Sequence, residues 1–407
     1  MVTDKIPELL CPVGDMDSLY AAVRYGADAV YLGGGQFGMR VTAAMKDEEI
    51  ETAVRYAHEH GVRVYLTCNT VPFDTEMAQL PTVLSRWDAF GIDALIVSDL
   101  GTLKAAKRYA PHCEIHVSVQ AGIVNSETAT AFYELGAKRV VLARELSLEQ
   151  IAFLRAHTPD DLELEAFVHG AMCVSFSGRC LLSSYMTGRD ANRGECAQPC
   201  RWRYSLVEET RAGQYFDITE NEQGTFLLNA NDLCMIEHLD CMTAAGIGSL
   251  KIEGRAKSDY YIAVTANAYR GALDSLKSAA NGWSAPDWTL CELEKISHRP
   301  YSAGFYFGKP TAAQNYETSN YIRTYTVAAT VIDYQDGQII ATLKNKFNRG
   351  TELDCLEAGT PPFPVPTDFL FDQDGEPLET ANHAMMTVRI PFDRPVQKGA
   401  YLRMKNA

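Results

Sequence analysis

The segment GADAVYLG at residues 26–33 carries the plan on which most of the chain is built. A glycine is followed by a small or polar pair and then by an apolar run. The same plan returns in GIDALIVS (91–98), GAKRVVLA (136–143) and GIGSLKIEG (246–254). Glycine suits the left-handed residue at which a helix ends and the chain turns into a strand. Each copy therefore predicts a helix end followed by a buried strand.

Outward from these copies, apolar runs alternate with amphipathic stretches over the first 255 residues. The strand candidates are 8–10, 29–32, 62–67, 94–98, 115–119, 139–143, 162–169, 226–229 and 250–253. The helical patterns are 16–25, 47–60, 76–90, 102–109, 126–135, 148–157 and 233–245. Strands that alternate with helices form parallel βαβ units. Eight or nine strands predict an α/β fold of the TIM-like (β/α) barrel type, which need not be regular, and a doubly wound open sheet is the alternative.

The end of the chain follows a different pattern. From residue 321 apolar and polar residues alternate around Asp336-Gly337, which is a strong hairpin signal. We expect a barrel over 1–280 with a cysteine-rich insertion at about 170–225, an irregular connecting segment over 281–320, and a small C-terminal antiparallel β-barrel over 321–407. Small β-barrels often bind oligonucleotides, so this last domain is a candidate for RNA binding.

Composition limits the class of protein. The 407 residues are 46% hydrophobic and 22% charged, which is ordinary for a globular protein. The sequence shows no targeting signal and no apolar run long enough to span a membrane, so we expect a cytoplasmic protein without a membrane partner. The net charge of −15 disfavours nucleic-acid binding over the whole surface, and any such binding would need a local basic patch.

The most informative segment is HGAMCVSFSGRCLLSSYMTGRDANRGECAQPCRWR, residues 169–203. It places Cys173, Cys180, Cys196 and Cys200 with six, fifteen and three residues between them. The eleven cysteines of the chain are an odd number, and clustered thiolates in a reducing compartment are typical of zinc or iron–sulfur sites. Only the last pair has the spacing of a zinc ribbon, which favours a [4Fe–4S] cluster over zinc or four structural thiols. Cys234 is a rival fourth ligand.

The cysteine-rich insertion is also basic. It contains five arginines (179, 189, 193, 201 and 203) but only two acidic residues, Asp190 and Glu195, and Trp202 lies among them in the sequence. Arginine and an aromatic side chain suit phosphate and base contacts, although the arginines could equally pair with acidic neighbours.

In a TIM-like barrel the chemistry lies at the carboxyl ends of the strands. Glu253 and Arg255 end the last predicted strand, where they could bind a carboxylate and supply a proton or form a structural ion pair. His169 ends the seventh strand, where it could be a proton donor, a hydrogen-bonding partner of the metal centre, or a core histidine. Other polar or thiol side chains expected at or near strand ends are Cys11, Asp15, Asn69, Cys68, Asp99, His116, Ser118, Gln120, Arg144 and Glu145.

A nucleotide-binding motif and the common protease motifs do not explain the function. GGGQFG at residues 33–38 satisfies G-x-G-x-x-G, but no helix pattern begins before about Asp47, so nucleotide binding is not indicated. A glycine-rich loop that holds a substrate anion fits better. Neither H-E-x-x-H nor G-x-S-x-G occurs, although a cysteine paired with a distant histidine stays open.

Three stretches resemble the peptidase U32 family: FVHGAMCVSFSGRCLLSS, ELLCPVGDMDSLYAAVRYGADAVYLGG and SLKIEGRAKSDYYIAVTANAYRGALD. HRPYSAGFYFG and LKNKFNRGTELDCLEAG resemble the subgroup with a C-terminal β-barrel, which contains the prephenate-dependent tRNA uridine(34) hydroxylation proteins. The likeness covers nearly the whole chain.

The resemblance implies an oxidoreductase-type enzyme that hydroxylates the wobble uridine of tRNA to 5-hydroxyuridine without oxygen, with prephenate as co-substrate. It implies a [4Fe–4S] cluster on Cys173, Cys180, Cys196 and Cys200, with Cys234 as a replacement. Related proteins act on ribosomal RNA or in quinone synthesis, and the peptidase name reflects early collagenase assignments. Apart from the resemblance, a collagenase-type protease and a non-catalytic iron–sulfur chain that needs a second homologous subunit are alternative hypotheses.

Overall fold

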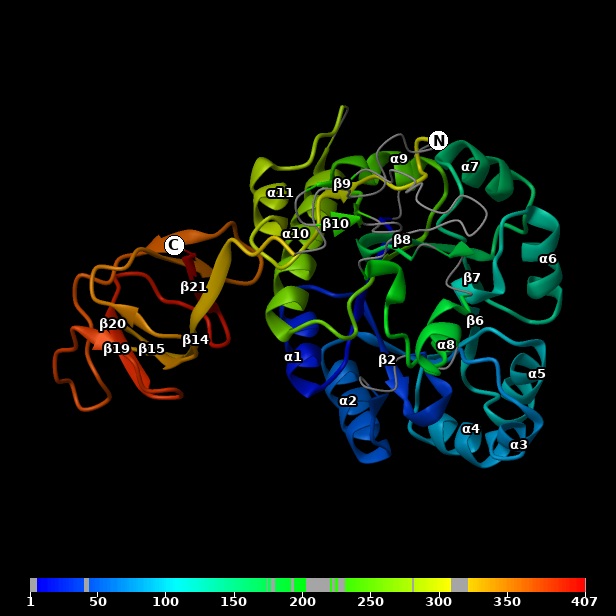
Figure 1. Ribbon diagram of the computed structural model, residues 1–407, viewed down its shortest axis with the longest axis horizontal. Coiled ribbons are helices and arrows are strands. Elements are labelled where there is room, and N and C mark those ends of the chain that lie inside the picture. Colours follow the sequence, from blue (N-terminus) through cyan, green and yellow to red (C-terminus); the bar gives the residue numbers. More distant parts are fainter. Residues whose placement is uncertain are drawn as a thin grey trace, which may run out of the picture.

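A closed barrel of eight parallel strands forms the larger part of the computed structural model (Figure 1). The structure describes residues 6–39, 44–173, 175–176, 180–191, 194–202, 220–221, 224–225, 231–279, 282–308 and 321–406. The barrel strands are β1 (Glu8–Pro12), β2 (Ala29–Gly34), β4 (Arg63–Cys68), β5 (Ala94–Val97), β6 (Glu114–Val117), β7 (Arg139–Val141), β8 (Glu163–Ala171) and β12 (Ser249–Ile252). β12 pairs in parallel with both β8 and β1, which closes the ring and confirms the predicted TIM-like barrel.

Helices follow the strands and surround them. They are α1 (Met16–Arg24), α2 (Asp47–Glu59), α3 (Asp74–Met77), α4 (Leu80–Ala89), α5 (Leu100–Tyr109), α6 (Ser126–Glu134), α7 (Leu148–Ala156), α9 (Leu239–Ala244) and α10 (Asp259–Ser278). The pattern at 76–90 predicted one helix, whereas the structure has two. Pro81 lies in the first turn of α4, where its missing N–H costs nothing, so a new helix begins there.

Short helices and strands lie at the ends of the barrel strands, in the insertion and in the segment that follows α10. They are η1 (Gly35–Phe37), β3 (Ala44–Met45), η3 (Val119–Ala121), α8 (Leu182–Thr187), η6 (Pro199–Arg201), β9 (Glu220–Asn221), β10 (Gly224–Thr225), β11 (Asp232–Cys234), η8 (Ile236–His238), α11 (Asp287–Leu293) and β13 (Tyr301–Ser302). The helix predicted at 233–245 is wrong at its start, because β11 pairs with the long end of β8. The segment predicted to be irregular contains α11 and β13. The strand predicted at 226–229 lies outside the described residues.

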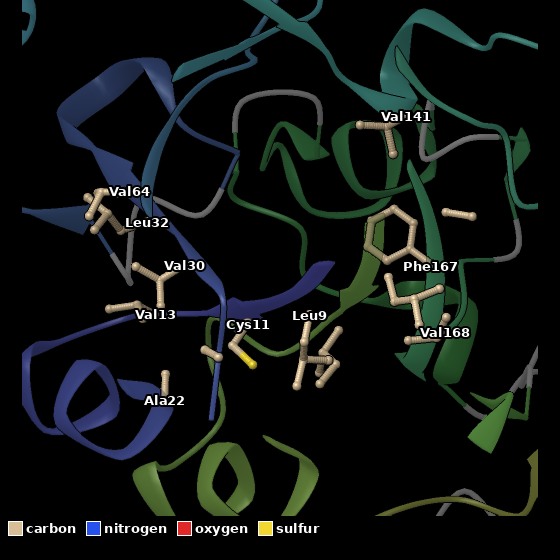
Figure 2. Packing of buried hydrophobic residues seen from close by; sticks show 14 of the residues in the cluster. Leu9, Cys11, Val13, Ala22, Val30, Leu32, Val64, Val141, Phe167 and Val168 are labelled. Carbon is tan, nitrogen blue, oxygen red and sulfur yellow. The ribbon is translucent and has the colours of Figure 1, made fainter. Parts of the chain in front are cut away.

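Alternate residues of each strand face opposite sides of the barrel wall. Leu9, Cys11 and Val30 pack outward with helix residues in the main hydrophobic cluster, part of which Figure 2 shows. Tyr31 and Tyr65 belong to a smaller cluster formed by the other face of the strands. This period of two leaves the interior of the barrel to a few aromatic and charged side chains.

The C-terminal unit is a curled antiparallel sheet in the order β18-β17-β21-β14-β15-β20. Its strands are β14 (Tyr325–Gln335), β15 (Gln338–Leu343), β17 (Leu353–Leu356), β18 (Phe363–Val365), β20 (Thr387–Pro391) and β21 (Tyr401–Lys405), and β16 (Phe347–Asn348) pairs with β19 (Thr380–Ala381). Asp336 and Gly337 join β14 to β15 with φ angles of 51° and 75°, as a two-residue type I′ hairpin requires. The predicted hairpin is therefore confirmed.

Buried ion pairs fasten this sheet to the barrel. Arg403 on β21 is fully buried and donates to Glu292 on α11 at 2.8 Å and to Asp354 on β17 at 2.5 Å. Tyr401 donates its hydroxyl hydrogen to Asp259 at the start of α10 at 2.8 Å. Figure 1 shows the sheet as a separate lobe beside the α10 and α11 side of the barrel. These contacts fix the sheet next to the barrel mouth.

Candidate functional site

A cavity of about 1030 Å³ opens at the carboxyl ends of the barrel strands. Side chains from most of the strands reach it, which is where a TIM-like barrel places its chemistry. The strands and the turns after them contribute Tyr31, Thr67, Asn69, Ile96, Ser118, Gln120, Val141, Arg144, Phe167, Lys251, Glu253 and Arg255. The insertion after β8 and part of the C-terminal sheet complete the wall.

All four cysteines of the insertion line this cavity. Cys173 and Cys196 are exposed, Cys180 and Cys200 are half-buried, and none is in a disulfide. The backbone N–H of Leu182 donates to the Cys180 sulfur at 3.3 Å, and that of Gln198 donates to the Cys196 sulfur at 3.3 Å. Such donors stabilise negative charge on sulfur, so the donor set fits a thiolate-ligated centre. Within the described ranges, however, no three Cys, His, Asp or Glu side chains converge on one metal-ion position.

Arg144 and Glu253 face each other across the cavity wall. The Arg144 guanidinium donates to the carbonyl of Ala171 at 2.9 Å and lies 3.7 Å from the centre of the Phe167 ring. Its Nη2 is 3.8 Å from Oε2 of Glu253. The two side chains are 15% and 21% exposed, so the pair can still be reached by a small ligand.

Two further cations lie on the inner wall. The Arg255 guanidinium is buried and donates to the Thr67 hydroxyl at 2.9 Å. The Lys251 ammonium donates to Glu165 at 2.8 Å and lies 4.3 Å from the centre of the Tyr31 ring. A carboxylate that entered the cavity would therefore meet positive charge beside an aromatic face.

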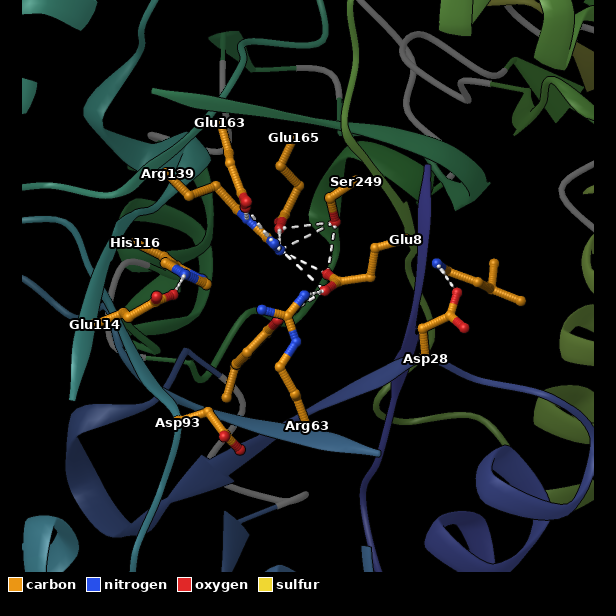
Figure 3. A network of polar contacts seen from close by, with 12 residues as sticks. Glu8, Asp28, Arg63, Asp93, Glu114, His116, Arg139, Glu163, Glu165 and Ser249 are labelled. Atoms are coloured by element: carbon orange, nitrogen blue, oxygen red, sulfur yellow. Dashed lines mark hydrogen bonds and ion pairs between the residues drawn. The ribbon is translucent and has the colours of Figure 1, made fainter. Parts of the chain in front are cut away.

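A buried charge network occupies the interior of the barrel (Figure 3) and includes Glu165, which accepts the hydrogen bond of Lys251. Arg139, 1% exposed, donates to Glu8 at 2.7 Å, to Glu165 at 3.1 Å and to Ser249 at 3.1 Å. Burial alone would raise the pKa of Glu8, but the charge and hydrogen bond of Arg139, with a contribution from Arg63, lower it to about 2. The network holds Glu165 ionised and thereby fixes the Lys251 ammonium.

The structure brings Glu253 and Arg255 to the cavity but places His169 elsewhere. The pairing of β8 with β12 skips Val168, because Phe167 pairs with Lys251 and the next pair is His169 with Ile252. Such a bulge re-aims the side chains that follow it. The His169 ring therefore packs 5.6 Å from the ring of Tyr269 on α10, and burial lowers its pKa to about 3.

Cys234 also lies apart from the four cavity cysteines. It pairs with His169 across β11 and β8, and its sulfur is 3.9 Å from the Tyr269 hydroxyl oxygen. Burial raises its pKa to about 11. Cys11 and Cys68 are buried in the main hydrophobic cluster, and burial raises the pKa of the Cys68 thiol to about 12. These three thiols are inert by environment.

Several polar residues predicted at the mouth have structural roles. Asp15 and Asp99 accept hydrogen bonds from the backbone N–H groups of Ser18 and Thr102, both at 2.8 Å, and so cap α1 and α5. His116 is fully buried in the barrel, which lowers its pKa. Asn69, Ser118, Gln120 and Glu145 do line the cavity. The glycine-rich loop 33–38 forms a tight turn, where a side chain at Gly34 would strike Trp87.

Sequence reasoning missed Lys251, Tyr31 and Phe167, which all reach the cavity. A signal was present, because charged residues such as Lys251 interrupt otherwise apolar predicted strands, and a buried charge requires a partner. Of the arginines in the insertion, Arg189 lines the cavity. Arg179, Arg193 and Arg203 lie outside the described residues.

The chain matches known proteins along nearly its whole length. Residues 14–316 match Peptidase family U32, and residues 323–403 match the Peptidase family U32 C-terminal domain. It is 34% identical to tRNA hydroxylation protein P1 of Bacillus subtilis, over 99% of this chain and 96% of the relative. It is also 34% identical to tRNA hydroxylation protein P of Escherichia coli, over 98% of this chain and 97% of that relative. An uncharacterized protease of Methanocaldococcus jannaschii is 43% identical over 74% and 73%.

Proposed function

The chain belongs to peptidase family U32, and from that membership we propose that it hydroxylates the wobble uridine of tRNA to 5-hydroxyuridine. Two relatives matched over nearly their full lengths are named for tRNA hydroxylation. The observation that carries the proposal is the cavity itself, in which four thiols and the cations of the barrel mouth line one space. A redox centre and an anionic reactant could thus meet there.

The inner cavity has the character of a base-binding pocket. Tyr31 and Phe167 supply apolar ring faces, and Asn69, Ser118 and Gln120 supply hydrogen-bonding groups. Enzymes that modify a base draw it out of its stack into a pocket of this kind and bind its polar edge. Uracil has both donors and acceptors on that edge, so amide and hydroxyl side chains suit it.

Prephenate, the proposed co-substrate, is a compact ring compound with two carboxylates, one on the ring and one on its side chain. Arg255 and Lys251 on the inner wall and Arg144 near the rim could each bind a carboxylate. The Phe167 ring lies under the Arg144 guanidinium and offers an apolar surface to the ring of the ligand. These contacts support a small dicarboxylate as the ligand of the cavity.

A [4Fe–4S] cluster is proposed on Cys173, Cys180, Cys196 and Cys200, which fit it by donor chemistry and line the same cavity, although no three of the described side chains converge on one metal position. When bound, the cluster would supply one-electron transfer. Replacing a uracil C–H by C–OH, with an oxygen atom at the oxidation level of water, releases two electrons and two protons, so the reaction also requires an external electron acceptor that takes up two electrons per turnover. Glu253 lies at the cavity wall, 3.8 Å from Nη2 of Arg144, where its carboxylate could take up a proton.

A peptidase function is the alternative that the family name raises. A thiol peptidase needs a histidine within reach of its cysteine. In the described part of the chain no histidine lines the cavity, although four cysteines do. This geometry favours hydroxylation over peptide cleavage. Ribosomal RNA or a quinone precursor is a further substrate alternative, and a second homologous subunit would show as a co-purifying chain.

The location of the protein belongs to the same proposal. No described helix is at once long and apolar enough to cross a membrane. A cytoplasmic location is what a tRNA substrate would require.

The first test is the iron and acid-labile sulfide content, with an absorption spectrum, of anaerobically purified protein. About four irons and four sulfides per chain are expected, with loss in Cys173→Ala and Cys196→Ala. Cys291→Ala is the matched control, because Cys291 is exposed but lies outside the cavity. No iron in a folded anaerobic sample would remove the redox proposal.

The second test is nucleoside analysis of tRNA from a deletion strain. The 5-hydroxyuridine-derived nucleosides should disappear and return with the parent gene and with Cys291→Ala, but not with Cys173→Ala. Retention of these nucleosides in the deletion strain, with no second copy of the gene present, would overturn the tRNA assignment.

A further inference from the structure

The cavity does not end at the barrel mouth but continues onto the C-terminal sheet. Beyond Arg255 its wall is formed by Lys257, by Lys295 next to α11, and by the segment that enters β14. Tyr321, Arg323 and Tyr325 belong to that segment, and Lys344 follows β15. We call this outer part of the cavity the inter-domain groove.

The lining of the whole cavity is positively charged although the chain is acidic. Its described lining holds eight lysine and arginine side chains and four aspartate and glutamate side chains, whereas the whole chain carries −15. Lys295 is held by Glu292 and Asp354 at 2.8 and 2.6 Å, so it adds little net charge. Arg323 and Lys344 are exposed to solvent at the outer end of the groove. The groove therefore attracts a polyanion on a surface that otherwise repels one.

Aromatic rings alternate with these cations. The Lys257 ammonium lies 4.4 Å from the centre of the Tyr321 ring, and the Lys295 ammonium lies 5.0 Å from that of Tyr325. Both tyrosines are partly exposed. Alternating cations and ring faces are what single-stranded nucleic acid needs, because the cations bind phosphates and the rings stack on bases. A protein partner would have no comparable need for this pairing.

The two walls of the groove are held in a fixed relation. Arg403 joins the sheet to Glu292 of α11 inside a fully buried ion pair, and the Tyr25 hydroxyl donates to the carbonyl of Leu356 at 3.0 Å. A groove between rigid walls can set the distance between a bound strand and the inner pocket.

We propose that the inter-domain groove binds the single-stranded RNA next to the target nucleotide, with phosphates on Lys257, Arg323 and Lys344 and bases stacked on Tyr321 and Tyr325. The proposal rests on the proposed function, because it takes the target base to lie in the inner cavity. It explains how a chain of such acidity retains an RNA substrate: the contacts are confined to one groove.

The test is the affinity of the full-length, anaerobically purified protein for a fluorescein-labelled anticodon stem-loop RNA, measured by fluorescence anisotropy over a series of KCl concentrations. The test variant is Arg323→Glu with Lys344→Glu. The matched control is Lys346→Glu with Lys398→Glu, which changes the net charge equally at exposed lysines outside the cavity. The four residues are exposed, so all variants should keep the parent melting temperature.

The groove variant should bind at least tenfold more weakly than the parent. Its slope of log Kd against log salt should fall by about 1.4, since each phosphate contact to a single strand contributes about 0.7. The control should bind within about twofold of the parent. Equal weakening of both variants, or no weakening of either, would overturn the groove assignment.

Failure of the groove and failure of the proposed function give different results. If the deletion strain lacks hydroxylated uridine but the groove variant binds RNA like the parent, the hydroxylation stands and the groove assignment falls. If the groove variant loses RNA binding but the deletion strain keeps its hydroxylated nucleosides, the groove stands and the tRNA assignment falls.

Discussion

Replacing Glu8 by Gln should destabilise the barrel by roughly 3 kcal/mol at neutral pH. The pKa of Glu8 is lowered from its ordinary value of 4.5 to about 2, and each pKa unit corresponds to about 1.4 kcal/mol. Removal of one partner from a buried ion pair generally lowers the free energy of unfolding by about 3–5 kcal/mol, a range that agrees with this value. The cost arises because Arg139, 1% exposed, would keep its charge while losing a carboxylate at 2.7 Å.

The sign of the pH dependence follows from the lowered pKa. A carboxylate whose folded pKa lies below its unfolded value stabilises the fold above the unfolded pKa, and this stabilisation is lost as the pH falls through 4.5 toward 2. The difference in unfolding free energy between the parent and Glu8→Gln should therefore shrink from roughly 3 kcal/mol at pH 7 to about 2 kcal/mol at pH 3.5.

Urea unfolding followed by tryptophan fluorescence at the two pH values would measure this difference. Glu163→Gln is the matched control, because Glu163 also contacts Arg139, at 2.6 Å, but is 31% exposed. The control should lower the unfolding free energy by less than about 1 kcal/mol, because the Glu163 carboxylate is partly screened by water and Arg139 keeps its contacts with Glu8 and Glu165. The reasoning would be refuted if both variants had equal effects, or if the effect of Glu8→Gln were the same at both pH values.

Two other substitutions test how the site is built. Gly170→Ala should lower the free energy of unfolding by about 1–3 kcal/mol and abolish the proposed hydroxylation, because Gly170 has φ +105° and a Cβ there would lie 2.4 Å from the carbonyl oxygen of Glu253. Gly188→Ala is the control, since Gly188 has φ +70° but open space around it, and thermal unfolding should show a loss of only about 1 kcal/mol. Arg403→Met should lower the unfolding free energy by about 3–5 kcal/mol and weaken RNA binding, whereas Arg349→Met, in an exposed pair, should change the urea midpoint little.

The fold was predictable because its signals are local. The glycine at position 26 and its three counterparts end helices, and the apolar runs after them become β2, β5, β7 and β12. The hairpin at Asp336-Gly337 was equally clear, since few residue pairs accept positive φ twice in succession. The errors also have local causes. A strand that begins at Asp232 was read as helix because its pairing partner lies more than sixty residues away.

The candidate site was predictable only in part. The cysteine spacing identified four residues that line the cavity, and the last strand identified Glu253 and Arg255. The position of His169 could not be foreseen, because it depends on how β8 pairs with β12 after Val168. A shift in pairing by one residue changes the face on which a side chain lies, and nothing in the local sequence marks it.

The sequence by itself determined the alternation of helices and strands, the cysteine cluster and the hairpin that begins the C-terminal sheet, because each depends on neighbours a few residues apart. Tertiary structure alone decided that Lys251 lies over Tyr31, that Arg139 fills the barrel, and that a basic groove joins the two domains. These features depend on contacts between residues far apart in the chain. A buried charge requires a partner, and its pKa depends on its surroundings, so both are decided only when the chain is folded.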